Sequence, residues 1–135
     1  MWDKLFAPSD LLQKGMEASW LRNAVIRDNL ANYETPGFKS SNVEFETILA
    51  SALETGGFTS KQTREKHISI GNGDLSSLAP RVTQNRELSM RMDGNNVDVE
   101  AENVKLAQNS LYYNTMLEKL NSELRRIKLA VSEGK

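Results

Sequence analysis

The sequence contains no cysteine among its 135 residues, and it has one histidine, three prolines and an aromatic content of 7%. Without cysteine the chain can form no disulfide bond, thiolate nucleophile or cysteine-ligated metal site, although this absence identifies no cellular compartment. The net charge is -1 and both signs are interspersed, so no basic field would hold a nucleic-acid backbone. With 39% apolar residues, the chain has the composition of one ordinary folded domain.

Long apolar runs are also missing. No stretch approaches the ~20 apolar residues that a membrane span requires. The first residues show no basic region followed by an apolar run, which a cleaved secretory signal would need. We therefore expect no membrane insertion and no cleaved signal, and any export from the cytoplasm must use another route.

The N-terminal segment, residues 1–33, has the pattern of a long amphipathic helix. Ser9 or Asp10 can cap it, and apolar residues then recur in steps of three and four. The stripe consists of Leu5, Ser9, Leu12, Met16, Ser19, Asn23, Ile26, Leu30 and Tyr33. Ser19 and Asn23 interrupt the stripe, while the flanking faces are partly apolar, so the pattern indicates a helix with more than one neighbour.

Residues 34–55 are predicted to form a turn and a short helix. Pro36 ends the first helix, and Gly37 fits the position of a type II turn that requires a positive φ. A short helix is expected over residues 43–53, before two glycines. Residues 56–92 follow with many small and polar residues and a turn cluster at 71–74, so we interpret them as loop or weakly β structure that orders against neighbours.

The C-terminal segment, residues 93–135, is predicted to be a turn followed by the longest helix. Asp98 is a suitable N-cap, and the helix of about 33 residues would be roughly 50 Å long. Its apolar stripe consists of Val99, Asn103, Leu106, Ser110, Tyr113, Leu117, Leu120, Leu124, Ile127 and Val131. The predicted fold is therefore a single mainly α domain, with long N- and C-terminal helices in a coiled-coil-like bundle and an irregular middle segment.

Two interpretations of the apolar stripes fit the pattern. The terminal helices can pair with each other inside one chain, or they can pack against neighbouring chains. The first helix is the shorter of the two, so apolar surface is expected to remain for a partner.

Catalytic and metal-binding patterns are not found. His67 has no nucleophile or second ligand close in the sequence, and neither a Gly-x-Ser-x-Gly turn nor a His-Glu-x-x-His helix is present. The turn at 93–98 superficially resembles a calcium loop, but Val97 and Val104 occupy its fifth and twelfth positions. We therefore expect no enzyme activity, no cofactor and no metal site.

Two motifs carry a family resemblance. The first, residues 29–39, is similar to the N-terminal signature of the axial proteins of the bacterial flagellum, with Phe38 where tyrosine is common. The second, residues 93–100, together with the short middle segment, resembles the proximal rod proteins of the FlgB type more than the sister FlgC type. The motif and turn residues are Asn29, Ala31, Asn32, Thr35, Pro36, Gly37, Phe38, Asp93, Gly94, Asn95, Asn96, Val97 and Asp98.

The resemblance implies a structural subunit of the rod in the flagellar basal body, in the periplasmic or cell-wall space, exported by the flagellar type III apparatus. Implied partners are copies of the chain, rod proteins of the FliE, FlgC, FlgF and FlgG types, and the membrane ring protein FliF. The expected packing residues are Leu12, Met16, Ile26, Leu30, Leu106, Tyr113, Leu117, Leu120, Leu124 and Ile127. The alternative is a helical adaptor or chaperone-like module that captures a partner's helix.

Overall fold

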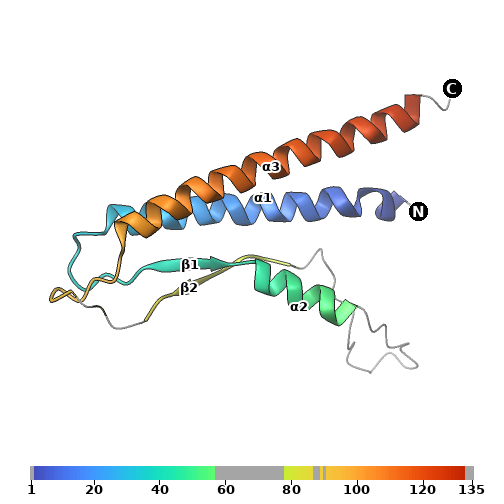
Figure 1. The fold of residues 1–135 in the computed structure, drawn as a ribbon. Coiled ribbons are helices and arrows are strands. Elements are labelled where there is room, and N and C mark those ends of the chain that lie inside the picture. The colour runs from blue at the N-terminus through green and yellow to red at the C-terminus, as the bar shows by residue number, and fades with distance from the viewer. Residues whose placement is uncertain (1, 57–77, 87–88, 90, 133–135) are drawn as a thin grey trace, which may run out of the picture.

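The computed structural model describes residues 2–56, 78–86, 89 and 91–132 (Figure 1). Its elements follow the order α1 (Trp2–Ala31), β1 (Ser41–Glu44), α2 (Glu46–Gly56), β2 (Arg81–Gln84) and α3 (Val99–Ser132). The predictions for the turn cluster at 71–74 and for His67 lie outside the described residues. Within the described ranges, no helix is both long and apolar enough to cross a membrane.

The two long helices, α1 and α3, lie side by side and run antiparallel, so both chain termini are at the same end (Figure 1). A two-stranded antiparallel sheet lies along α1 and continues into α2, which gives the molecule a second layer. In the sheet, Ser41 pairs with Gln84 and Val43 with Val82. The predicted mainly α class, with long terminal helices and a short central helix, is confirmed.

The predicted helix caps at Ser9 and Asp10 are wrong, because α1 already begins at Trp2 and contains Pro8. Proline removes one N–H donor and its ring crowds the carbonyl four residues earlier, but Pro8 lies close to the start of α1, so only the first turns of the helix are affected. A residue that suits the N-cap position allows a helix to begin there, but the helix can also begin earlier in the chain. At its other end α1 stops at Ala31, two residues before the predicted end.

The predicted helix at 43–53 starts too early, because Ser41–Glu44 is the strand β1 and α2 begins at Glu46. Val43 and Phe45 are buried whereas Asn42 and Glu44 are exposed, which is the two-residue period of a strand. The pairing strand β2 lies nearly forty residues later, inside the segment interpreted as loop or weakly β, so local pattern alone could not show it.

Among the residues whose burial the structure describes, the buried ones are few and half of them are polar. The buried apolar set is Ala18, Ile26, Val43, Phe45, Leu78 and Val97, and the buried polar set is Ser19, Asn29, Ser40, Asn95, Glu102 and Asn109. Between the long helices, the Ser19 hydroxyl donates to Asn109 Oδ1 at 2.9 Å, and the Asn109 amide donates to the Ser19 carbonyl at 2.8 Å. Polar pairs therefore set the register of the helix pair.

The face that α3 turns toward α1 differs from the predicted stripe at alternate positions. Residues 106, 113, 120 and 127 of the stripe are partly buried, and the other positions of α3 that face α1 include Glu102, Asn109 and Met116. The predicted members Asn103, Ser110, Leu117 and Leu124 are exposed. The predicted stripe passed over Glu102 and Asn109, whose polar side chains lie at the contact with α1 because each has a hydrogen-bonding partner there. The exposed members of the stripe remain available to neighbouring chains.

Candidate functional site

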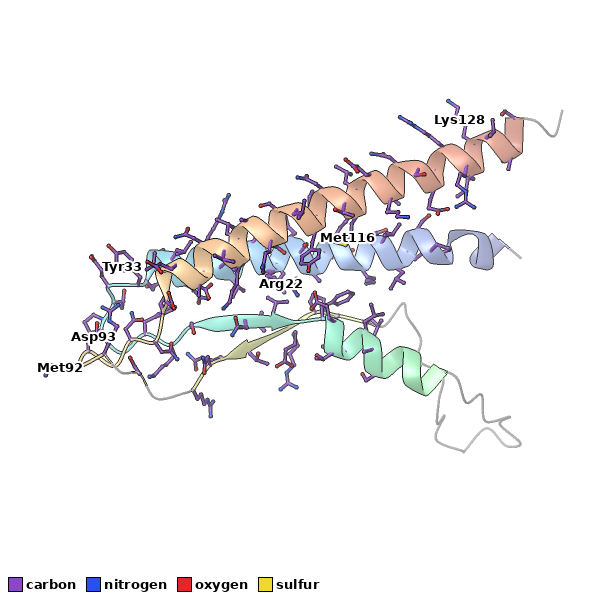
Figure 2. The ribbon with its side chains drawn as sticks, in the orientation of Figure 1. Arg22, Tyr33, Met92, Asp93, Met116 and Lys128 are labelled. Carbon is purple, nitrogen blue, oxygen red and sulfur yellow. The ribbon has the colours of Figure 1, made fainter. Side chains whose placement is uncertain are left out.

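The most highly connected region is the place where the two sequence motifs meet, at the end of the helix pair away from the termini. We call residues 32–40 and 91–98 the turn junction. Figure 2 shows Tyr33 and Asp93 at this end of the molecule and Lys128 near the other. Residues 32–40 follow the end of α1, and residues 91–98 precede the start of α3. The junction therefore fixes how α1 and α3 are joined.

The first half of the junction terminates α1. The Asn32 side-chain amide donates back to the Asp28 carbonyl at 2.8 Å, and the Thr35 amide donates to the Asn32 carbonyl at 3.0 Å. The Phe38 amide donates to the Thr35 carbonyl at 3.2 Å across Pro36 and Gly37. The φ of Gly37 is 73°, so the predicted positive φ is confirmed, and other L-residues would be strained there.

Asn95 is the centre of the junction, with no exposed surface. Its Nδ2 donates to the carbonyl oxygens of Asn32, Tyr33 and Thr35 at 2.9, 3.1 and 2.9 Å. Its Oδ1 accepts from the Val97 amide at 2.7 Å. One side chain thus satisfies several carbonyls that the end of α1 leaves without helical partners.

Backbone contacts reinforce this arrangement. The Gly37 amide donates to the Asp93 carbonyl at 2.8 Å, and Lys39 Nζ donates to the Gly94 carbonyl at 2.8 Å. Gly94 also has a positive φ, 75°, and a Cβ built on it would lie 3.8 Å from the Gly37 Cα. The two glycines therefore face each other where the two turns meet.

Charged groups at the rim of the junction are paired. The Asn95 amide and the Arg91 guanidinium hold the pKa of the Asp93 carboxyl below its ordinary value, with the backbone hydrogen bond as the larger cause. Arg91 also donates to the Tyr33 carbonyl at 3.0 Å. A hydrogen bond to Glu34 raises the pKa of the Tyr33 hydroxyl. Arg91 therefore bridges the two motifs from outside while Asn95 bridges them from inside.

A second cluster lies next to the junction, where α1, β1 and α3 meet. Asn29 accepts from the Ser41 amide at 2.9 Å, donates to the Ser41 carbonyl at 2.8 Å and donates to Glu102 Oε2 at 3.0 Å. Lys105 Nζ donates to Glu102 Oε1 at 2.6 Å. Both Asn29 and Glu102 are buried, so this cluster connects three elements through satisfied polar groups.

Asn96 and Asp98 orient the segments beside the junction. Asn96 Oδ1 accepts from the Ser40 amide at 2.7 Å, and its Nδ2 donates to the Asn85 carbonyl at 3.1 Å. Asp98 Oδ1 accepts from the amides of Glu100 and Ala101, at 3.0 and 3.1 Å. The predicted N-cap of α3 is confirmed.

The sheet and α2 are also connected to α1 by an ion pair. Arg22 Nη2 lies 2.6 Å from Glu46 Oε2. Partial burial alone would raise the pKa of Glu46, but hydrogen bonds from Arg22 and from backbone amides hold it below its ordinary value.

Two apolar grooves border the helix pair. The outer groove, about 550 Å³, is lined mainly by Met16, Trp20, Tyr113, Leu120 and Leu124. The inner groove, also about 550 Å³, lies between the helix pair and α2 and is lined mainly by Leu11, Leu12, Phe45, Leu49 and Met116.

Exposed apolar side chains continue along α3. The exposed fraction is 38% for Leu117, 48% for Leu124 and 56% for Leu129. Among the other predicted packing residues, Ile26 is buried and Leu30, Leu106 and Ile127 are partly buried.

Sequence reasoning missed several functional residues of this region. Glu102 stands in the first turn of α3, where a negative charge is favourable, and that position does not reveal its buried contact with Asn29. Asn109, Lys39 and Arg91 were not singled out. Polar residues at seam positions of both helices, in antiparallel register, are the signal that could have identified Asn29 and Glu102 as partners. No sequence signal links Arg91 to the Tyr33 carbonyl.

The turn junction joins the two terminal helices at one end, and apolar faces along these helices remain open to neighbours. Together these features define a helical assembly subunit. Comparison with known proteins identifies the family to which this subunit belongs. Flagellar basal body rod protein FlgB of Aeromonas hydrophila is 37% identical over 125 residues, covering 91% of this chain and 89% of that protein. The FlgB proteins of Yersinia enterocolitica and Bacillus subtilis are 30% and 27% identical, covering 99% and 92% of this chain and 100% and 92% of their own lengths. No family model matches the chain.

The chain belongs to the FlgB family of flagellar basal body rod proteins. It is a structural subunit of the rod, located in the flagellar basal body, and it assembles with other basal-body components. Its relatives are structural rod proteins and not enzymes. The resemblance predicted from residues 29–39 and 93–100 is confirmed, and no relative supports the adaptor alternative.

Proposed function

We propose that the chain forms the proximal part of the rod, where its terminal helices pack with those of neighbouring subunits into a tube that transmits torque. The observation that carries this proposal is the row of exposed apolar residues on α3. Burying the exposed half of Leu117, Leu124 or Leu129 would contribute about 1 kcal/mol each. Many such contacts in parallel distribute a turning force over the whole helix surface.

The packing residues of this proposal are Leu12, Met16, Ile26, Leu30, Leu106, Tyr113, Leu117, Leu120, Leu124 and Ile127. Ile26 is already buried within the chain, so its role is to pack the helix pair itself. The junction residues have a different role. Asn32, Thr35, Pro36, Gly37, Asn95, Asn96 and Asp98 set the angle and register at which the helices are presented. The separation of the two roles follows from the hydrogen bonds of the junction and from the exposed apolar surface along the helices.

Folding is coupled to assembly in this scheme. The buried set of the chain is small and half polar, so burial within one chain stabilises the helix pair only weakly. Neighbouring subunits then supply the missing apolar contacts. A chain of this kind can pass a narrow export channel unfolded and gain its order in the tube.

The proposed partners are copies of the chain, rod proteins of the FliE, FlgC, FlgF and FlgG types, and the ring protein FliF. Export uses the flagellar type III apparatus without a cleaved signal, and the assembled subunit lies in the periplasmic or cell-wall space. The subunit has no enzymatic role in this scheme.

The test is electron microscopy of basal bodies from a strain with an in-frame deletion of this gene. We expect membrane rings without rod, hook or filament, and complete basal bodies when the wild-type gene is supplied on a plasmid. Intact rods in the deletion strain would overturn the proposal. Rods that stop after a proximal segment would place the chain further out than proposed.

A further inference from the structure

We propose that α1 of one copy packs beside α3 of a second copy through paired charges, with Asp10 and Glu17 facing Arg126 and Lys119. The inference rests on the proposed function, because it requires that copies of the chain are neighbours in the rod. It goes further by assigning two faces and a register.

The acidic pair and the basic pair have the same spacing. Each pair is separated by seven residues, which is two turns or about 10.5 Å along a helix. Both pairs are accessible: Asp10 and Lys119 are exposed, and the side chains of Glu17 and Arg126 are 48% and 73% exposed. Two salt bridges can therefore form at once when the helices lie antiparallel.

The contacts that two of these residues make within the chain do not prevent this. Glu17 lies 3.6 Å from Lys14, and Arg126 lies 3.0 Å from Glu123, each within one helix turn. Exposed pairs at this spacing contribute little, so they can give way to an oppositely charged partner on a second copy. The charges then select the partner face, and the apolar contacts beside them supply most of the affinity.

Aromatic side chains extend the same contact toward the turn junction. Trp20 is 71% exposed on α1, and Tyr112 is 61% exposed on α3. In the register that pairs Glu17 with Lys119, Tyr112 of the second copy lies about one helical turn from Trp20. Large aromatic residues are typical of the centre of a stable interface, so the charged pairs would lie to one side of the aromatic contact.

The proposed register differs slightly from the internal one. Within the chain Gly15 faces Met116, whereas pairing Glu17 with Lys119 displaces the second α3 by about five residues, or about 7.5 Å. The faces in contact are different on the two copies, so each copy keeps one face free for the next. Such a heterologous contact repeats into a ring or a helical tube.

Disulfide trapping tests the pairing, because the chain has no native cysteine. Glu17→Cys and Lys119→Cys are placed on separate chains and produced together in cells that lack the wild-type gene. We expect a reducible dimer of about twice the 15.2 kDa chain mass in isolated basal bodies, and none when either variant is produced alone. Glu118→Cys is the matched control for Lys119→Cys, since it is an exposed neighbour that points about 100° away, and it should give about fivefold less dimer.

Equal dimer with the control, absence of dimer in assembled rods, or cross-linking to a protein of another mass would overturn the proposal. A second measurement decides the matter if a cysteine variant does not assemble. Asp10→Lys with Glu17→Lys, or Lys119→Glu with Arg126→Glu, should lower the number of rods about fivefold, and all four changes in one chain should restore them. Failure of the fourfold variant to restore rods would exclude a second copy as the partner.

The two proposals fail in distinguishable ways. If the deletion strain keeps its rods, the proposed function is wrong. If that strain lacks rods and the cysteine variants rebuild them without a cross-link between positions 17 and 119, only the pairing is wrong.

Discussion

Replacing Asn95 by alanine removes the side chain that joins the two halves of the turn junction. Three carbonyl oxygens lose the Nδ2 donor, and the buried Val97 amide loses its acceptor. The carbonyls of Tyr33 and Thr35 belong to exposed residues, so water can replace their partner. The Val97 amide is buried, so water cannot replace its lost acceptor.

The expected loss follows from these contacts. A net hydrogen bond contributes about 0.5–1.5 kcal/mol, and a buried unsatisfied amide costs about 1–3 kcal/mol. With most of the carbonyls rehydrated, Asn95→Ala should lower the free energy of unfolding by about 2–4 kcal/mol. This is a large part of the stability expected for a domain with such a small core.

The isosteric change Asn95→Asp separates hydrogen bonding from shape. Its carboxylate can still accept from Val97, but it presents negative oxygens to the three carbonyls, so this variant should be less stable than Asn95→Ala at neutral pH. Burial raises the pKa of the new carboxyl in the folded state. Its stability relative to alanine should therefore improve as the pH falls and the carboxyl becomes protonated, and worsen as the pH rises.

The assay is urea unfolding of the purified chain, followed by circular dichroism, with hydrogen exchange of the Val97 amide as a local probe. Asn121→Ala is the matched control, since Asn121 is exposed on α3, and its effect should stay within about 0.5 kcal/mol. If Asn95→Ala also stays within that limit, or if Asn95→Asp is as stable as wild type at neutral pH, the central role of Asn95 is refuted.

Gly15→Ala should stabilise α1 by less than the ~1 kcal/mol that helix propensity alone gives, because its Cβ would lie 2.7 Å from the Met116 sulfur, and Met116→Ala should remove that contact cost in a double-mutant cycle of unfolding energies. The Arg22–Glu46 pair should contribute stability above pH 4.5, the ordinary pKa of the glutamate, and lose that contribution as the pH falls through the lower folded pKa. Urea melts of Glu46→Gln and wild type should therefore converge at low pH. Leu117→Asp should abolish swimming in soft agar while the chain is still exported, because it places a charge in the proposed contact between subunits.

Each of these three predictions has its own control. In the Gly15 cycle, additive energies would show that the Met116 contact is not the cause. A constant difference between Glu46→Gln and wild type from neutral to low pH would exclude the ion pair as the source. Ser122→Asp adds the same charge to another exposed position of α3, so swimming should persist, and a motile Leu117→Asp strain would count against the packing role.

Much of the fold could be predicted because it depends on local signals. The end of α1 is encoded by Pro36 and Gly37, and the start of α3 by Asp98, each of which acts within its own turn of chain. The strand at Ser41–Glu44 depends on a partner that is distant in the sequence, so its short pattern was interpreted as helix. Local chemistry sets the boundaries of an element, while tertiary pairing decides its type.

In the candidate site, too, the features that depend on local signals could be predicted and those that depend on tertiary pairing could not. The sequence identified the two motifs, and their individual turns form as expected. The hydrogen bonds from Asn95 to the end of α1, and from Asn29 to Glu102, depend on three-dimensional register that no spacing rule gives. The stripe on α3 passed over Glu102 and Asn109 for a related reason: polar residues can occupy an interface when their partners are present on the other helix.

The polar pairs between α1 and α3 join residues that are far apart along the chain, 90 positions for Ser19 with Asn109 and 73 for Asn29 with Glu102. When such a chain threads through a narrow channel, whichever helix emerges first waits for most of the polypeptide before its own partner arrives. Pairing over these separations is slow, because a long loop must close before any contact forms. A delay of this kind gives a growing structure time to capture the leading helix before the chain can close on itself.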